Sequence, residues 1–353
     1  MSRPAASIAS AALAAAFLLG PSADLAAQSA DIPRTPYGRP DLQGNWTNAT
    51  ITPVQRNPGQ PAVLTKEQVA DIEAGRREFF EENLQPSDPD RGAPPVGGAS
   101  LGDPLFDAAA GGTGGYNVFF IDPGSRVAVF DGEPRSSLVT NPPNGRIPAL
   151  TPEAQRRMSE LAARRSRFGE YDNPENRPLS ERCLTSFGLN MGPPMLPNYF
   201  YNNNYTIVQT PDHVMIMTEM VHDVRVIPIG ERPDVPDDFR PWFGVSWGRW
   251  EGDTLVVETT NIRLDQLQES SYVFPGGSEN LKVVERFTRA DENTLNYEFT
   301  VIDPEWYTAE WGGQIPFERL EGNVYEYACH EANYSLTNVL SGARAEERAA
   351  ASR

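Results

Sequence analysis

The sequence predicts a mainly β fold, in which antiparallel strands close into a barrel with two peripheral helices and long loops around it. Runs of β-branched and apolar residues, such as 214–217 and Thr254–Thr260, are bounded by Pro-Asp and Gly-Asp turn signals. These runs follow one another too closely for helices between them, which favours antiparallel pairing. A hydrophobic content of 39% and an aromatic content of 10% suffice for a substantial core. A β-sandwich of the same strands is the alternative.

The N-terminus has the features of an export signal, which we assign to residues 1–27. Arg3 supplies a positive charge, residues 5–19 form an apolar core, and Leu25-Ala26-Ala27 is a small-residue cleavage site. No later stretch approaches the uninterrupted apolar length of a membrane span. We therefore expect a periplasmic or secreted protein with no integral membrane segment after cleavage.

Charge and cysteine content restrict the possible partners and the covalent structure. The formal net charge is −18, and Lys66 and Lys282 are the only lysines. Such acidity argues against nucleic acid or an anionic membrane as a partner. Cys183 and Cys329 are the only cysteines, and in an oxidising compartment two cysteines most often form a disulfide. A catalytic thiol is less favoured, because no motif places a base beside either cysteine.

Two helices are predicted from capping signals and periodicity. Thr65-Lys-Glu-Gln fits a capping box, and apolar residues follow at helical spacing, which predicts a helix over 66–83. Thr151 followed by Pro152 predicts the start of a second helix, over 152–168. The arginines of this second helix indicate a solvated face rather than a nucleic-acid site, because the rest of the chain is strongly acidic.

The other elements belong to one β-rich domain, residues 28–340. Within it, the Pro/Gly/Ala/Asp-rich segment 85–115 is predicted to be a flexible loop, and the tail 341–353 to be disordered or a frayed helix. Turn signals and alternation predict the central strands of 199–262 and further strands at 116–121, 126–130, 137–140, 281–289, 294–302, 307–312 and 323–330.

A Gly-x-Trp motif, Gly44-Asn45-Trp46, opens the first predicted strand of the barrel. It resembles the lipocalin signature, in which the tryptophan plugs the closed end of a barrel and packs under an arginine from a late strand. The resemblance implies a lipocalin-like barrel that includes Trp46. A plain core position for Trp46 is the alternative.

Longer motifs are spread over nearly the whole mature chain. They are Pro40-Asp-Leu-Gln-Gly-Asn-Trp, Arg182-Cys-Leu, Gln209-Thr-Pro-Asp-His-Val, Val221-His-Asp-Val-Arg-Val-Ile-Pro, Gly248-Arg-Trp-Glu-Gly-Asp-Thr-Leu and Cys329-His-Glu-Ala-Asn-Tyr. Together they resemble a family of exported bacterial proteins. That resemblance implies export and a β-rich fold, and it supplies no catalytic residues.

Two functions fit the predicted barrel, and the first is ligand binding. A small, partly apolar molecule would lie in a cavity lined by aromatic and acidic side chains. The residues predicted to contact it are Tyr201, Tyr205, Met217, Trp242 and Trp247. The oligomeric state is left open.

The second function is acid/base catalysis in the same cavity, by an isomerase, lyase or hydrolase. The proton carrier would be His222 or His330, with partners among Glu219, Glu258, Glu285 and Arg225. Neighbouring residues on a strand point to opposite faces, so a histidine and its carboxylate would have to come from different strands.

No metal or other cofactor is predicted. A metal site would require His213, His222 and His330 to converge with a glutamate, and the spacing of these histidines matches no recognised metal signature.

Overall fold

The structure is a computed structural model, and it describes residues 32–86, 90, 92, 118–188, 190–269 and 273–353. The predicted export signal, 1–27, and most of the predicted loop, 85–115, lie outside the described residues. No helix within the described ranges is long and apolar enough to cross a membrane.

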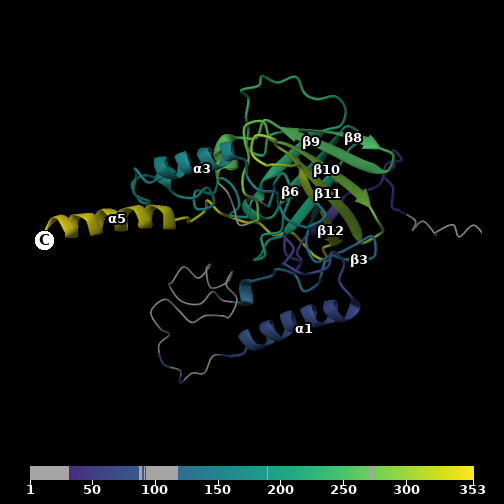
Figure 1. Cartoon of the computed structure of the whole chain (residues 1–353), viewed down its shortest axis with the longest axis horizontal. Coiled ribbons are helices and arrows are strands. Elements are labelled where there is room, and N and C mark those ends of the chain that lie inside the picture. Colours follow the sequence, from purple (N-terminus) through teal and green to yellow (C-terminus); the bar gives the residue numbers. More distant parts are fainter. Residues whose placement is uncertain (1–31, 87–89, 91, 93–117, 189, 270–272) are drawn as a thin grey trace, which may run out of the picture. The chain divides into compact units, whose positions relative to one another are not determined.

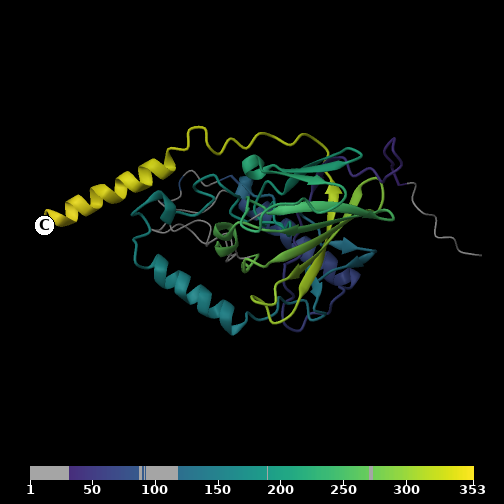
Figure 2. The same cartoon turned by 90° about the horizontal axis from the view of Figure 1, so that it is seen from above.

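Antiparallel strands form one sheet that curls into a nearly closed barrel (Figures 1 and 2). They are β1 (Gly44–Thr47), β4 (Val139–Asn141), β5 (Asn204–Gln209), β6 (His213–Thr218), β7 (Val224–Pro228), β8 (Val245–Glu251), β9 (Thr254–Thr260), β10 (Lys282–Arg289), β11 (Thr294–Ile302) and β12 (Trp311–Arg319). The order is β7-β6-β5-β1-β12-β11-β10-β9-β8, and β4 pairs with β12 off this path. Ile229 after β7 bridges Gly248 of β8, which brings the two edge strands together. A separate hairpin joins β2 (Val129–Phe130) to β3 (Glu133–Pro134).

Alternating side chains fill the inside of the barrel. On β10, Val283, Glu285 and Phe287 are buried and the residues between them are partly exposed. The largest fully buried side chains of the strands are Trp46, Trp311, Tyr205, Tyr297, Phe287 and Phe317. The Tyr297 ring lies against those of Phe287 and Phe317, with ring centroids 5.1 and 5.3 Å apart. Large aromatic rings of this kind dominate the burial energy of a core, and here they occupy the space that a hollow barrel would offer to a ligand.

Trp46 closes one end of the barrel. On β1 it pairs with Tyr205 and with Arg319, so it lies within the predicted sheet. The guanidinium groups of Arg289 on β10 and Arg319 on β12 lie 4.6 and 5.5 Å from its ring centroid. A cation over an indole face is an attractive contact. The lipocalin-like barrel that includes Trp46 is therefore confirmed.

The loop after residue 190 covers the other end. The Met195 backbone N–H donates to the Tyr297 hydroxyl at 2.9 Å. The Tyr205 hydroxyl donates to the Asn190 carbonyl at 2.9 Å and accepts from the Asn48 amide at 3.2 Å. Because the hydroxyls of buried tyrosines need partners, these bonds fix the loop across the barrel.

In the part of the chain that the structure describes, four α-helices and three short 3₁₀ turns lie outside the sheet, and Figure 1 labels α1, α3 and α5. The α-helices are α1 (Lys66–Asn83), α3 (Pro152–Arg165), α4 (Leu264–Gln268) and α5 (Ser335–Ala351), and the 3₁₀ turns are η1 (Val118–Phe120), η2 (Pro174–Asn176) and η3 (Met220–His222). The Thr65 hydroxyl accepts from the Gln68 N–H and Thr151 accepts from Ala154, so both predicted caps form. The predicted tail, 341–353, belongs to α5 up to Ala351.

Three strand predictions were wrong. The strand predicted over 307–312 begins at Trp311 and runs to Arg319. The sequence does not predict this strand because it contains Gly312, Gly313 and Pro316, and such residues usually mark turns. In the structure the two glycines lie at a register shift opposite β4, where a Cβ on Gly312 would be 2.2 Å from the Phe299 carbonyl oxygen.

The other two corrections concern 116–121 and 323–330. The described part of the first forms the 3₁₀ turn Val118–Phe120 in place of a strand. The second has no strand pairing, and residues 321–330 form a strap that bonds to the β6–β7 turn and to Asn45 of β1 through single contacts. Both segments have residues that favour a β conformation, but no described strand pairs with either of them.

Candidate functional site

A buried ion pair lies at the centre of the barrel. Glu285 is 0% exposed and Arg225 is 4% exposed. Arg225 donates from Nη1 to one carboxylate oxygen of Glu285 at 3.0 Å and from Nη2 to the other at 2.5 Å. Tyr297 donates its hydroxyl to the same carboxylate at 2.9 Å. Burial, followed by the charge of Glu285, raises the pKa of Tyr297 well above its ordinary value.

Two hydroxyls complete this cluster. Arg225 Nη2 also donates to Ser246 on β8 and Thr259 on β9, at 3.2 and 3.1 Å. The arginine on β7 is thereby bound to β8, β9 and β10 at the seam of the barrel. Because the cluster is charge-balanced and sealed from solvent, it has the properties of a structural tie between strands.

The other predicted catalytic residues are not brought to this cluster. Glu258 faces outward, where it forms ion pairs with Lys282 and Arg249. The hydrogen bond from Lys282, more than the other contacts, lowers the pKa of Glu258. His222 and His330 are exposed. Within the described residues, no side-chain hydrogen bond or ion pair joins either histidine to a candidate glutamate, and acid/base catalysis stays a prediction.

Three contacts fasten residues 325–329 of the strap, which spans residues 321–330. The buried Glu219 carboxylate accepts from the Tyr325 backbone N–H at 3.1 Å and from the Asn204 amide at 2.7 Å. His222 lies with Nδ1 3.1 Å from the Tyr327 carbonyl oxygen, and this nitrogen must donate because a carbonyl only accepts. The third contact is the disulfide.

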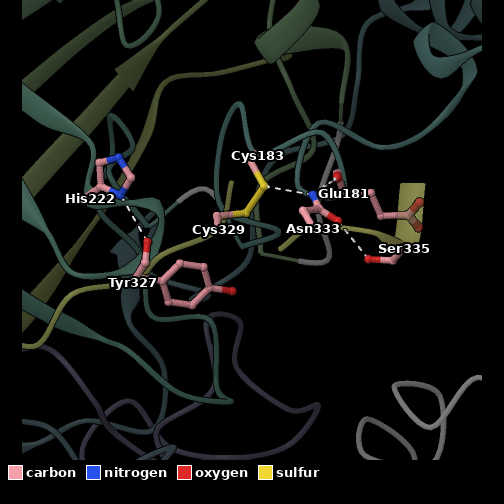
Figure 3. The surroundings of a disulfide bond; sticks show 7 residues. All are labelled: Glu181, Cys183, His222, Tyr327, Cys329, Asn333 and Ser335. Atoms are coloured by element: carbon pink, nitrogen blue, oxygen red, sulfur yellow. Dashed lines mark hydrogen bonds between the residues drawn. A yellow bond between two sulfur atoms is a disulfide. The ribbon is translucent and has the colours of Figure 1, made fainter. Parts of the chain in front are cut away.

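Cys183 and Cys329 form this disulfide, which confirms the predicted pairing (Figure 3). Figure 3 also shows the Asn333 amide, which donates to the Cys183 sulfur at 3.2 Å and to the Glu181 carbonyl. Asn333 in turn accepts from the Ser335 hydroxyl at 2.8 Å. The disulfide thus holds the end of the strap, and the Asn45 amide, which donates to the Gly322 carbonyl at 3.0 Å, holds its start.

The turn beneath the strap contains a perturbed carboxyl group. Val221 and His222 have φ values of 63° and 50°, a conformation that is costly for a β-branched residue. The next residue is Asp223, whose Oδ2 has no hydrogen-bond partner among the described residues. Burial raises the pKa of Asp223 to about 7. The strained turn therefore holds a carboxyl that titrates near neutral pH.

Replacing Asp223 by asparagine is expected to stabilise the protein at about pH 8, by about 1–3 kcal/mol, and to have little effect near pH 4. Because the pKa of Asp223 is raised in the folded state, that state binds more protons than the unfolded chain between about pH 4 and 7. The stability contributed by protonation is present below this window and is lost as pH rises through it. Urea unfolding at several pH values measures the effect, and an unchanged difference between the two proteins from pH 4 to 8 would contradict it.

The five predicted ligand contacts are distributed over different surfaces. Tyr205 points into the filled barrel, and Tyr201 lies against Phe187 with ring centroids 5.7 Å apart. Met217 is partly exposed on the opposite face of β6 from the buried Ile216. Trp242 and Trp247 are covered by Arg263 and Arg232, whose guanidinium carbons lie 4.8 and 5.5 Å from the ring centroids. These residues do not line one common cavity in the described structure.

A groove outside the barrel was missed by the sequence analysis. It lies between the C-terminal half of α3, the segment 168–182 and α4, and its volume is about 960 Å³. We call it the α3 groove. Its apolar lining includes Leu161, Phe168 and Leu179. A second pocket of about 380 Å³ shares Leu161 with it and extends toward Trp306.

The contacts of α3 explain why this groove exists. The start of the helix is fixed to the barrel, since Thr151 donates to the Glu305 carbonyl and Ala154 is fully buried. Beyond Met158, only Leu161 is partly buried, and the last turn of the helix is exposed. The C-terminal half of α3 therefore forms one wall of the groove beside α4 and does not pack into it.

No known protein family and no curated protein matches this chain. Among the described residues, no group of three or more His, Cys, Asp or Glu side chains is placed to hold a metal ion.

Proposed function

We propose that the protein is an exported barrel protein that binds a small, partly apolar molecule in the α3 groove. The observation that carries the proposal is the contrast between this groove and the barrel. The groove has a volume of about 960 Å³, within the range of sites for small ligands. The barrel is occupied by aromatic rings and by the Arg225–Glu285 pair.

The lining of the groove supports an amphipathic ligand. Phe168 is 52% exposed, and Leu264 beside the second pocket is 36% exposed. Exposed apolar side chains in a concave site are typical of ligand pockets, because a bound molecule removes them from water. Arginines between them supply the polar contacts that would orient the ligand.

Export is supported by two features of the chain. One is the predicted signal over 1–27. The other is the disulfide, a bond that persists mainly in oxidising compartments. A binding protein in such a compartment would meet small molecules before they reach the cell interior.

The neutral dye N-phenyl-1-naphthylamine tests the proposal, because its fluorescence rises in an apolar site. We expect the native protein to bind it and Phe168→Ala to bind it about five-fold more weakly, a loss of about 1 kcal/mol of apolar contact. Phe239→Ala is the matched control, since Phe239 is also 52% exposed but does not line the groove. Absence of binding by the native protein, or equal loss in both variants, would contradict the proposal.

A further inference from the structure

The α3 groove is rich in arginine although the chain has a net charge of −18. The arginines that line it are Arg164, Arg165, Arg177, Arg182 and Arg263. The carboxylates that line it are those of Glu170, Glu175, Asp265 and Glu269. Which of these charges are already paired decides what the groove can bind.

Two of the arginines are neutralised within the protein. Arg177 forms ion pairs with Glu170 at 2.5 Å and with Glu181 at 2.7 Å. Arg263 forms one with Asp265 at 3.0 Å. Buried or half-buried guanidinium groups normally acquire such partners.

The other three arginines form no such ion pair with any described residue. Within the described residues, no hydrogen bond or ion pair engages the guanidinium groups of Arg164, Arg165 or Arg182. Arg182 is half-buried, and a guanidinium group in that position presents several donors without an acceptor. These groups are available to a ligand.

Arg165 and Arg182 act on the same part of the groove. Burial raises the pKa of Glu269, and the charges of Arg165 and Arg182 are among the smaller effects that oppose this rise. The Glu269 carboxylate itself is bonded to the Leu179 backbone N–H, at 2.9 and 3.0 Å. The two guanidinium groups therefore face one region without being bound to its carboxylate.

We propose that the α3 groove binds an amphipathic anion, with its carboxylate, sulfonate or phosphate group at Arg165 and Arg182 and its apolar body against Leu161 and Phe168. Charge-assisted bonds from guanidinium groups to oxyanions are among the stronger polar contacts. The net negative charge of the chain acts at longer range and is screened beyond about 10 Å at moderate salt. This inference rests on the proposed function and adds the chemical class of the ligand.

A matched pair of dyes tests the charge requirement. The dye 8-anilinonaphthalene-1-sulfonate has the skeleton of N-phenyl-1-naphthylamine and carries a sulfonate in addition. We expect the native protein to bind the sulfonate dye about ten-fold more tightly than the neutral one at low salt. Added sodium chloride should reduce that preference without weakening the neutral dye.

Variants then locate the anion. Arg165→Gln and Arg182→Gln should each weaken the sulfonate dye about ten-fold and leave the neutral dye nearly unchanged. Arg182→Lys keeps the charge and should retain part of the preference. Arg167→Gln is the control, because Arg167 is exposed just after α3 and does not line the groove. Far-ultraviolet circular dichroism checks that each variant is folded.

The outcomes separate the two levels of the proposal. If the neutral dye binds and the sulfonate gives no advantage, or if Arg167→Gln reduces the advantage as much as Arg182→Gln, the anion inference is overturned while the binding function stands. If the neutral dye does not bind the native protein, the binding function fails and this inference with it.

Discussion

Replacing Glu285 by glutamine is expected to lower the free energy of unfolding by about 3–5 kcal/mol. The change leaves the Arg225 guanidinium charged, 4% exposed and without a counter-charge inside the barrel. Glutamine keeps the volume of the side chain, so little of the loss would come from a cavity. Urea unfolding followed by tryptophan fluorescence measures the change.

Glu251→Gln is the control for this experiment. Glu251 also pairs with two arginines, Arg249 at 2.8 Å and Arg286 at 3.0 Å, but its side chain is 41% exposed. Solvent screening leaves such an exposed pair with little effect on stability. If both variants lose equally little, the buried cluster is not the tie between strands that its geometry indicates.

Removing both charges at once should cost less than removing one. The double variant Arg225→Met, Glu285→Leu leaves no unpaired charge in the barrel, and apolar replacements of buried pairs are often tolerated. We therefore expect it to be more stable than Glu285→Gln. A double variant that is the less stable of the two would show that the bonds from Arg225 to Ser246 and Thr259 dominate instead.

Replacing Cys183 and Cys329 together by serine is expected to destabilise the protein by about 5 kcal/mol on the chain-entropy account. The bond closes a loop between residues 146 positions apart, and a cross-link over such a distance restricts the unfolded chain strongly. Apart from the disulfide, single hydrogen bonds hold the strap, residues 321–330: the Tyr325 backbone N–H donates to Glu219, His222 donates to the Tyr327 carbonyl, and the Asn45 amide donates to the Gly322 carbonyl. Its release should be detected as faster proteolysis between Leu320 and Asn333.

Alkylation before and after reduction provides the control. The native protein should take up no label under denaturing conditions without a reductant, and two labels per chain with one. If the double serine variant has the same urea midpoint of unfolding as the native protein, the disulfide does not stabilise the fold by restricting the unfolded chain.

The hairpin of β10 and β11 shows how much local sequence can predict. Its bounds, Lys282–Arg289 and Thr294–Ile302, differ from the predicted ones by a single residue. Alternation over eight or more residues and an intervening turn are local signals, and they suffice when both strands pair with their neighbours in sequence. The strand β12 was misplaced because its glycines, which look like turn residues, lie where β12 pairs with β4, a strand far away in the sequence.

The groove was missed for a comparable reason. The sequence shows arginines after Pro152 and predicts a solvated face, which is correct for Arg156 with its ion pairs to Glu153 and Glu160. It does not show that Arg165 of α3 and Arg182 of a later loop line the same concave surface. Long-range packing brings these two segments together, and hydrophobic periodicity, which is a local signal, cannot predict it.

The sequence by itself determined the barrel class, the tryptophan at its closed end, both principal helices and the disulfide. The first three follow from local patterns. The disulfide follows because the chain has two cysteines, which can form only one pair. Only the tertiary structure decided which ionisable residues face inward. Glu258 and Glu285 occupy mid-strand positions that look alike in the sequence. The register aligns Glu285 with Val257 and Glu258 with Val284, so the two glutamates lie on opposite faces of the sheet. The direction in which the sheet curls then places Glu285 inside the barrel and Glu258 on its outer face, and alternation alone cannot specify that direction.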